Sequence, residues 1–299
     1  MTQSANPIEA GTEARSFDAA SAADWCERYA RQHYENFSVV TRFLPGHLHA
    51  PMYTVYAYCR FTDDLGDEAP GDRLALLAQW DHELGAAFGG GATHPITVAL
   101  AEVVAEFEME QGPFARLIEA NRRDQTQARY PTFQDLLEYC DYSASPVGEM
   151  VLALFGYRDE YRIALSNATC TALQLANHWQ DVARDCAAGR IYLPLEDLRQ
   201  FGVSEEQIAA RRSNGAFREL MRFEVDRAEA LFRQGEPLVD EVDRDLRVDL
   251  RLFTAGGRAV LRAIEKQRYD VLTRRPTISS QQKGRMLLKA LVQRYVLGS

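Results

Sequence analysis

The spacing of apolar residues limits most strongly what this chain can fold into. From Ala22 onward, apolar residues recur three and four positions apart, and strict alternation of apolar and polar residues is hard to find. Such spacing places apolar side chains along one face of an α-helix, whereas a half-buried strand needs alternation. The sequence therefore predicts an all-α protein, and its 46% hydrophobic content is ample for a sizeable core.

The chain carries no segment that would separate two domains. Its helix-breaking stretches, such as "LPGHLHAP", "FGGGATHP", "GRIYLPLEDL" and "RRPTISS", are short, and the composition does not shift midway. We expect one all-α domain over residues 21–299. Residues 1–20 are rich in Ala, Ser and Thr, contain acidic residues and lack an apolar core segment, so we expect disorder there and no secretory signal.

Two helix starts can be placed from their capping residues. Thr132 is followed three positions later by Asp135, and Ser204 is followed three positions later by Gln207. An N-cap hydroxyl with a polar side chain three residues on can satisfy backbone N–H groups reciprocally. We therefore expect helices to begin after Thr132 and after Ser204.

Composition narrows the function classes. The net charge of -9 argues against a general nucleic-acid binder, so an anionic ligand would need a local basic site or a bound metal. The five cysteines lack CxxC spacing and are odd in number, which indicates reduced thiols in a cytoplasm and no zinc site. No apolar run approaches the ~18 residues of a membrane-spanning helix.

The stretch "FTDDLGDEAP", residues 61–70, gathers three aspartates and a glutamate within six positions. In a helix, Asp63 and Asp67 lie one turn apart with Asp64 beside them, and Tyr56 and Arg60 precede them on the same stripe. Like charges at this spacing repel each other. Two interpretations stay open: the stripe faces water, or it binds cations.

A second polar stripe lies within "LQLANHWQDVARDCAAGRIY", residues 173–192. Gln174, Asn177, Asp181 and Asp185 follow one another at spacings of three, four and four, in a mostly apolar segment. Two such helices facing each other across a cavity would offer the oxygen ligands that Mg²⁺ prefers, with a diphosphate completing the coordination. The alternative is two unrelated solvated faces.

Basic and aromatic residues accompany the two stripes. Arg60 and Arg190 could grip phosphate oxygens or form salt bridges with neighbouring aspartates. A patch at residues 138–150, "EYCDYSASPVGEM", combines Tyr139 and Tyr142 with small residues that let a substrate come close. Its tyrosines could offer a π face to a carbocation or could simply belong to the core.

These motifs resemble the squalene and phytoene synthases, head-to-head prenyl transferases with the all-α isoprenoid synthase fold, in which helices surround a central cavity. The resemblance runs from about His33 to the C-terminus and rests on "DDLGD" and "NHWQDVARD". It implies Mg²⁺ bound by Asp63, Asp64, Asp67, Asn177, Asp181 and Asp185. It also implies substrate contacts from His33, Asn36, Phe37, Arg60, Gln174, Arg190, Tyr192 and Arg275, with Tyr56, Tyr142, Asp63 and Asp181 as catalytic residues.

Two departures from the family pattern narrow the resemblance. Asn36 stands where typical members have Ser, and the usual "YVAGLVG" or "GVAGTVG" is "YSASPVG" here, with Ser143, Ser145 and Pro146 departing. Together with "NHWQDV", these changes are most similar to the bacterial hopanoid-pathway enzymes that convert presqualene diphosphate to hydroxysqualene. That reaction would ionise the diphosphate and capture the cation with water.

Three alternatives stay open. One is head-to-head condensation of two prenyl diphosphates to presqualene diphosphate, squalene or phytoene. Another is chain elongation, since "DDLGD" fits a DDxxD pattern, although elongating enzymes carry a second DDxxD that this chain lacks. The third is a non-catalytic helical binding protein with solvated acidic stripes.

The end of the chain is basic. Residues 274–299, "RRPTISSQQKGRMLLKALVQRYVLGS", hold six Lys or Arg and no acid. Two interpretations stay open: a terminal helix packed on the body, with Arg275 reaching the diphosphate, or a peripheral contact with anionic lipid at the inner membrane surface. Oligomeric state is not indicated by the sequence.

Overall fold

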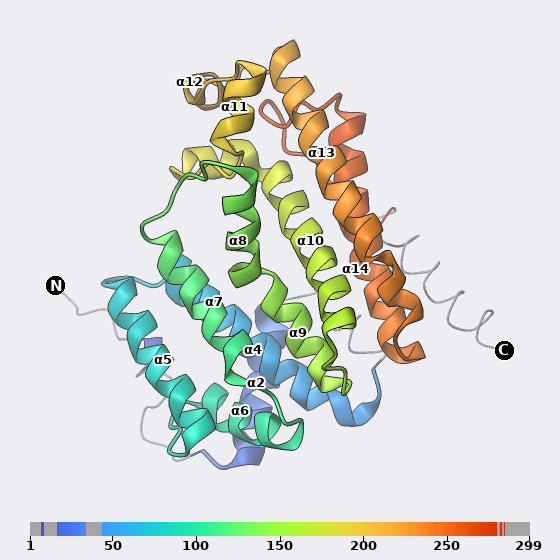
Figure 1. Cartoon of the computed structure of the whole chain (residues 1–299). Coiled ribbons are helices and arrows are strands. Elements are labelled where there is room, and N and C mark those ends of the chain that lie inside the picture. The colour runs from blue at the N-terminus through green and yellow to red at the C-terminus, as the bar shows by residue number, and fades with distance from the viewer. Residues whose placement is uncertain (1–6, 9–16, 34–43, 280–281, 283, 285–299) are drawn as a thin grey trace. The chain divides into compact units, whose positions relative to one another are not determined.

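A computed structural model describes residues 7–8, 17–33, 44–279, 282 and 284 of the chain (Figure 1). Within these residues the chain forms helices joined by turns, and the only β contact among them is an isolated bridge between Arg129 and Ile191. The predicted all-α fold class is confirmed. The residues group into two compact units, each with its own hydrophobic core.

The first unit comprises residues 1–126 and 146–159. Its described helices are α2 (Ala19–His33), the 3-10 turn η2 (Gly46–Leu48), α4 (His49–Asp67), α5 (Arg73–Gly89), α6 (Pro95–Glu106), α7 (Gln111–Asp124) and, from Pro146, α9 (Ser145–Leu154). Helix α4 packs against α2, α5, α6 and α7. Its acidic end is thus carried by a helix held on several sides.

Buried polar contacts set the position of α4 within this unit. Trp80 on α5 donates from Nε1 to Thr62 Oγ1 at 2.8 Å, and Thr62 donates onward to the Tyr58 carbonyl at 2.8 Å. The Tyr58 hydroxyl donates to the carbonyl of Phe114 on α7 at 3.0 Å. Because buried donors need partners, these bonds restrict how α4, α5 and α7 can slide past one another.

The second unit comprises residues 127–145 and 160–299. Its described helices are α8 (Phe133–Ser143), α10 (Glu160–Ala187), α11 (Leu195–Phe201), α12 (Glu205–Ala209), α13 (Gly215–Gly235), the 3-10 turn η3 (Glu236–Asp240) and α14 (Arg244–Lys266). The long helix α10 packs against α8, α13 and α14, as Figure 1 shows. Buried Trp179, Phe217 and Phe232 fill the core around it.

The predicted helix starts can be compared with the structure. Thr132 and Asp135 form the full capping box at the start of α8. Ser204 caps α12 by accepting from the Gln207 backbone, but the Gln207 side chain donates to Arg212 O and Asn214 Oδ1, both at 3.0 Å. The first capping box is confirmed, whereas only the hydroxyl half of the second forms.

Candidate active site

The acidic stripe of the first unit lies on the last turns of α4, where Asp63 contacts α7. Asn121 donates from Nδ2 to Asp63 Oδ1 at 3.2 Å. Protein atoms crowd the Asp63 carboxylate although the side chain keeps exposed surface; this desolvation raises its pKa to about 6, and the Asp67 charge adds to the effect. A bound cation would favour the ionised form.

Asp64 has a different set of partners. It accepts from the Tyr29 hydroxyl at 2.6 Å and forms an ion pair with Arg60 at 2.5 Å. Arg60 also contacts Glu68 at 2.9 Å. The salt bridge considered for Arg60 is therefore present. Since Arg60 already balances the charge of Asp64, a metal ion at Asp64 would compete with this ion pair, and its metal role stays a prediction.

Helix α2 reaches this stripe through Tyr29. The ring of Tyr29 lies 4.2 Å from the ring of His33, measured between centroids, while its hydroxyl holds Asp64. The predicted substrate residue His33 therefore contacts the tyrosine that binds Asp64. Tyr56 is half-buried one turn before Arg60. The predicted residues Asn36 and Phe37 lie outside the described residues.

Asn121 and Gln125, which the sequence analysis missed, support the backbone of the DDLGD turn. Gln125 donates from Nε2 to the carbonyl of Gly66 at 3.0 Å and to that of Asn121 at 2.9 Å. Asn121 is buried at 6% exposure and packs directly on Gly66. Their spacing of four, at the end of an amphipathic helix, was the available signal.

The acidic stripe of the second unit lies on α10, where Asp181 binds Arg275. The guanidinium donates from Nε and Nη2 to the two carboxylate oxygens, at 2.5 and 2.8 Å. Nη2 also donates to Gln180 Oε1 at 3.0 Å, and Gln180 donates to the Pro276 carbonyl at 2.6 Å. The predicted residues Asp181 and Arg275 are thus brought together from positions 94 apart in the sequence.

Asp185 lies one turn after Asp181, near the end of α10. Desolvation and then the Asp181 charge raise the pKa of Asp185 to about 7, opposed by Arg190, Arg184 and Arg275. Gly189, with φ 85°, follows α10 and leads to Arg190, as the sequence predicted. Of the other predicted residues, Asn177 is exposed and Gln174 is half-buried on the same helix.

An aromatic cluster lies behind this stripe. The rings of Tyr192 and His178 stack at 3.6 Å, and Tyr130 and Tyr139 lie 5.7 and 5.8 Å from Tyr192. Burial lowers the pKa of His178 to about 3, so this imidazole is neutral near pH 7. Tyr192 and Tyr139 are buried and belong to the core of the unit. Tyr142 is half-buried near the end of α8.

The departing serines have unequal surroundings. Ser145 donates to Asp141 Oδ1 at 3.2 Å, whereas the buried hydroxyl oxygen of Ser143 has no hydrogen-bond partner among the described residues. Burying a hydroxyl without a partner is costly unless a ligand or water supplies one. Ser143 is thus a candidate contact for a small polar molecule.

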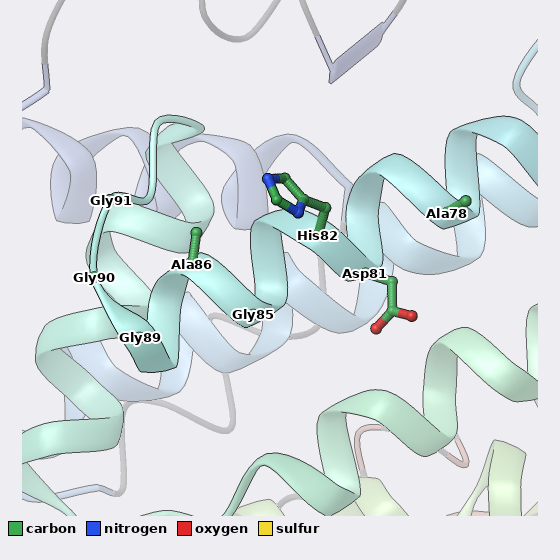
Figure 2. Close-up of a pocket in the computed structure, with 8 residues that line it drawn as sticks. All are labelled: Ala78, Asp81, His82, Gly85, Ala86, Gly89, Gly90 and Gly91. Atoms are coloured by element: carbon green, nitrogen blue, oxygen red, sulfur yellow. The ribbon is translucent and has the colours of Figure 1, made fainter.

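A separate hollow of about 670 Å³ runs along the outer face of α5 (Figure 2). Its lining consists of Ala78, Asp81, His82, Gly85, Ala86, Gly89, Gly90 and Gly91. Figure 2 shows Asp81 and His82 pointing in different directions from the helix, and Asp81 is ion-paired with Arg122 at 2.9 Å. The hollow contains no predicted site residue, and most of its lining is Ala and Gly. The two acidic stripes therefore remain the candidates for function.

The donor set suits magnesium that is shared with a substrate. Among the described residues, no three His, Cys, Asp or Glu side chains converge to hold a metal by themselves. Magnesium keeps waters and binds through one or two carboxylates plus substrate phosphates. Each unit by itself offers oxygens of this kind: Asp63 and Asp67 in the first, and Asn177, Asp181 and Asp185 in the second.

No helix in the described part of the chain is long and apolar enough to cross a membrane. All five cysteines are free thiols.

Comparison with known proteins identifies relatives over nearly the whole chain. Phytoene synthase from Arthrospira platensis is 31% identical over 291 residues, covering 91% of this chain and 93% of that protein. The 15-cis-phytoene synthase of Synechococcus elongatus is 30% identical, covering 93% of this chain and 95% of that protein.

Solved structures of two related enzymes are also similar to this chain. The squalene synthase HpnC from Alicyclobacillus acidocaldarius is 50% identical with a TM-score of 0.82, covering 84% of this chain and 96% of that chain. A dehydrosqualene synthase in complex with ligand is 27% identical with a TM-score of 0.84, covering 94% and 98%. The squalene/phytoene synthase family model matches residues 30–282, and this chain is therefore a member of the squalene/phytoene synthase family.

Proposed function

We propose that this protein converts presqualene diphosphate and water to hydroxysqualene and diphosphate, with Mg²⁺ as cofactor. The observation that carries the proposal is the 50% identity to the squalene synthase HpnC, compared with 31% to the phytoene synthase of Arthrospira platensis, which favours squalene-type over phytoene-type chemistry. The departing residues Ser143, Ser145 and Pro146 support it, because they lie in the segment expected to contact the hydrocarbon cation. Family membership favours an enzyme over a non-catalytic helical protein.

The chain's own residues would bind and orient the diphosphate. Arg190 and Arg275 supply guanidinium donors for its oxygens, and Arg275 would exchange its contacts with Asp181 for contacts with the ligand. Asp63, Asp67, Asn177, Asp181 and Asp185 would hold Mg²⁺. When bound, Mg²⁺ supplies positive charge that stabilises the leaving diphosphate.

Water capture completes the proposed reaction. The carbon–oxygen bond to diphosphate breaks, the electron pair leaves with the diphosphate, and water adds to the rearranged cation. The proton released by that water passes to diphosphate or solvent, which balances the reaction without a reductant. We also expect the enzyme to act in the cytoplasm, because five free thiols suit a reducing compartment.

A second candidate function is head-to-head condensation of two prenyl diphosphates. It is favoured by the similarity to phytoene synthases over more than 90% of this chain. Each condensation would release diphosphate and place the same demands on the acidic stripes. The two candidates therefore differ in the hydrocarbon chemistry and not in diphosphate binding.

One pair of incubations separates these candidates. Purified protein with Mg²⁺ and NADPH, the hydride donor that squalene formation needs, receives presqualene diphosphate in one reaction and farnesyl diphosphate in another, both in oxygen-18 water, and products are identified by mass spectrometry. We expect hydroxysqualene carrying the label from presqualene diphosphate. An unlabelled alcohol, or squalene as the main product, would contradict the hydroxysqualene assignment; turnover of farnesyl diphosphate would favour condensation.

A further inference from the structure

A second group of charged residues borders the C-terminal half of α10, beside Asp181. Arg184, Arg211, Arg274 and Arg275 line a cleft of about 230 Å³, which we call the arginine cleft. Its residues come from α10, from the turn after α12 and from the segment after α14, all within the second unit. No motif in the sequence predicted this convergence.

The arginine cleft has an excess of positive charge. Four guanidiniums and one carboxylate, that of Asp181, line it, which leaves a formal charge of +3 on a protein whose total is -9. Arg275 pairs with Asp181, and within the described residues Arg274 donates only to the neutral side chain of Gln267, at 3.2 Å. Exposed Arg184 and Arg211 make no hydrogen bond or ion pair through their side chains with any described residue.

The backbone at Arg211 holds the turn that follows α12. Arg211 has φ 53°, a left-handed conformation that non-glycine residues rarely adopt. Its N–H donates to the Ile208 carbonyl at 2.9 Å, which holds the turn after α12. A left-handed residue commonly ends a helix in this way, and here it fixes the turn that bears Arg211, which lines the cleft.

The size of the cleft restricts the ligand. A volume of about 230 Å³ lies below the ~300–1,000 Å³ of pockets that take drug-sized molecules. Buried Val271 and Leu272 form part of its lining, and the charged groups stand around them. Most of the exposed lining surface is apolar, so the guanidinium forks around it, which bind phosphate oxygens bidentately, would supply the contacts to an anion.

We propose that the arginine cleft binds inorganic diphosphate, the leaving group of the proposed reaction. The choice of this anion rests on the proposed function, whereas the existence of an anion site rests on the cleft itself. Arg275 lines the cleft and also holds Asp181, a predicted metal ligand. A diphosphate in the cleft therefore competes with Asp181 for Arg275, which couples release of the product to the state of the acidic stripe.

Calorimetric titration of inorganic diphosphate into the full-length protein tests this site. EDTA is present throughout, so that binding through Mg²⁺ is removed. The test variant is Arg184→Gln/Arg211→Gln, and the control is Arg199→Gln/Arg262→Gln, which removes the same charge from exposed positions outside the cleft. We expect the test variant to bind diphosphate at least tenfold more weakly and the control to stay within about twofold of the wild type.

Three results would overturn the proposal. They are no diphosphate binding by the wild type in EDTA, equal weakening in both double variants, and inorganic phosphate binding as tightly as diphosphate. Equal weakening would mean that net charge alone attracts the anion. Because the titration uses neither substrate nor metal, it can succeed when the product assay fails, so failure of the cleft and failure of the proposed reaction are separable.

Discussion

Gly66, the fourth residue of DDLGD, lies directly against Asn121 of α7. A Cβ atom added at position 66 would stand 2.0 Å from Asn121 Oδ1 and 2.8 Å from its Cγ. The same Asn121 donates to Asp63, and Gln125 donates to the Gly66 carbonyl. A glycine without a side chain therefore allows α7 to approach the acidic end of α4.

Gly66→Ala should consequently destabilise the protein, because the whole Asn121 side chain must move. We expect a loss of about 1–3 kcal/mol in the free energy of unfolding, measured by urea denaturation. The control is Gly85→Ala on α5, where a Cβ meets nothing within 4 Å. Alanine favours a helix interior by up to ~1 kcal/mol over glycine, so the control should gain stability. Equal effects in the two variants would contradict the close-packing explanation.

Asp63→Ala and Asp181→Ala should each abolish turnover while circular dichroism stays helical. Removing either carboxylate weakens metal and diphosphate binding together if the two stripes act as one metal site. Asp226→Ala, an exposed aspartate on α13, serves as the control and should keep full activity. Near-normal turnover in both site variants would rule out this assignment.

Thr62→Val should destabilise α4 without changing its shape. Valine keeps the volume but leaves the buried Trp80 N–H without its acceptor. An unsatisfied buried donor costs about 1–3 kcal/mol, which the urea midpoint should report. Thr62→Ser keeps the hydroxyl and should lose less; a greater loss in the serine variant would mean that packing of the methyl group matters more than the hydrogen bond.

Glu224 on α13 should make stability fall as pH rises. Its buried carboxyl lies 3.5 Å from Arg227 and beside the buried Asp197. Burial raises the pKa of Glu224 well above its usual value; Arg227 lowers it, whereas Asp197 raises it further. Above about pH 4.5 the unfolded chain releases this proton while the folded protein keeps it, so stability falls until pH passes the raised folded pKa.

Glu224→Gln removes the titrating carboxyl and should make folding stability depend less on pH. We expect the thermal midpoint of the variant, relative to the wild type, to rise between pH 5 and pH 8. Glu219→Gln, an exposed change on the same helix, should leave the wild-type slope unchanged. A difference between Glu224→Gln and wild type that stays constant with pH would show that Glu224 does not titrate in this range.

The lipid interpretation of the basic C-terminal segment makes its own prediction. Most of residues 280–299 lie outside the described residues, so the sequence alone carries it. Each Lys or Arg near an anionic surface contributes roughly 1 kcal/mol, so co-sedimentation with phosphatidylserine vesicles should weaken at high salt and when Lys283, Arg285 and Lys289 become Gln. Binding unaffected by both changes would exclude a membrane role for these charges.

The sequence by itself determined the features that depend on neighbours along the chain. Apolar spacing predicted an all-α protein, and Thr132 with Asp135 predicted the start of α8. The four-residue spacing of Asp63 and Asp67 predicted a shared helix face. These features follow from helix geometry, which relates each residue to those three and four positions away.

Only the tertiary structure decided which distant side chains meet these stripes. Asn121 reaches Asp63, Tyr29 reaches Asp64 and Arg275 binds Asp181, from positions 58, 35 and 94 apart in the sequence. Such contacts depend on how whole helices pack, since the burial of many apolar residues sets the register between helices. For the same reason the arginine cleft, built from three separate segments, has no signature in the sequence.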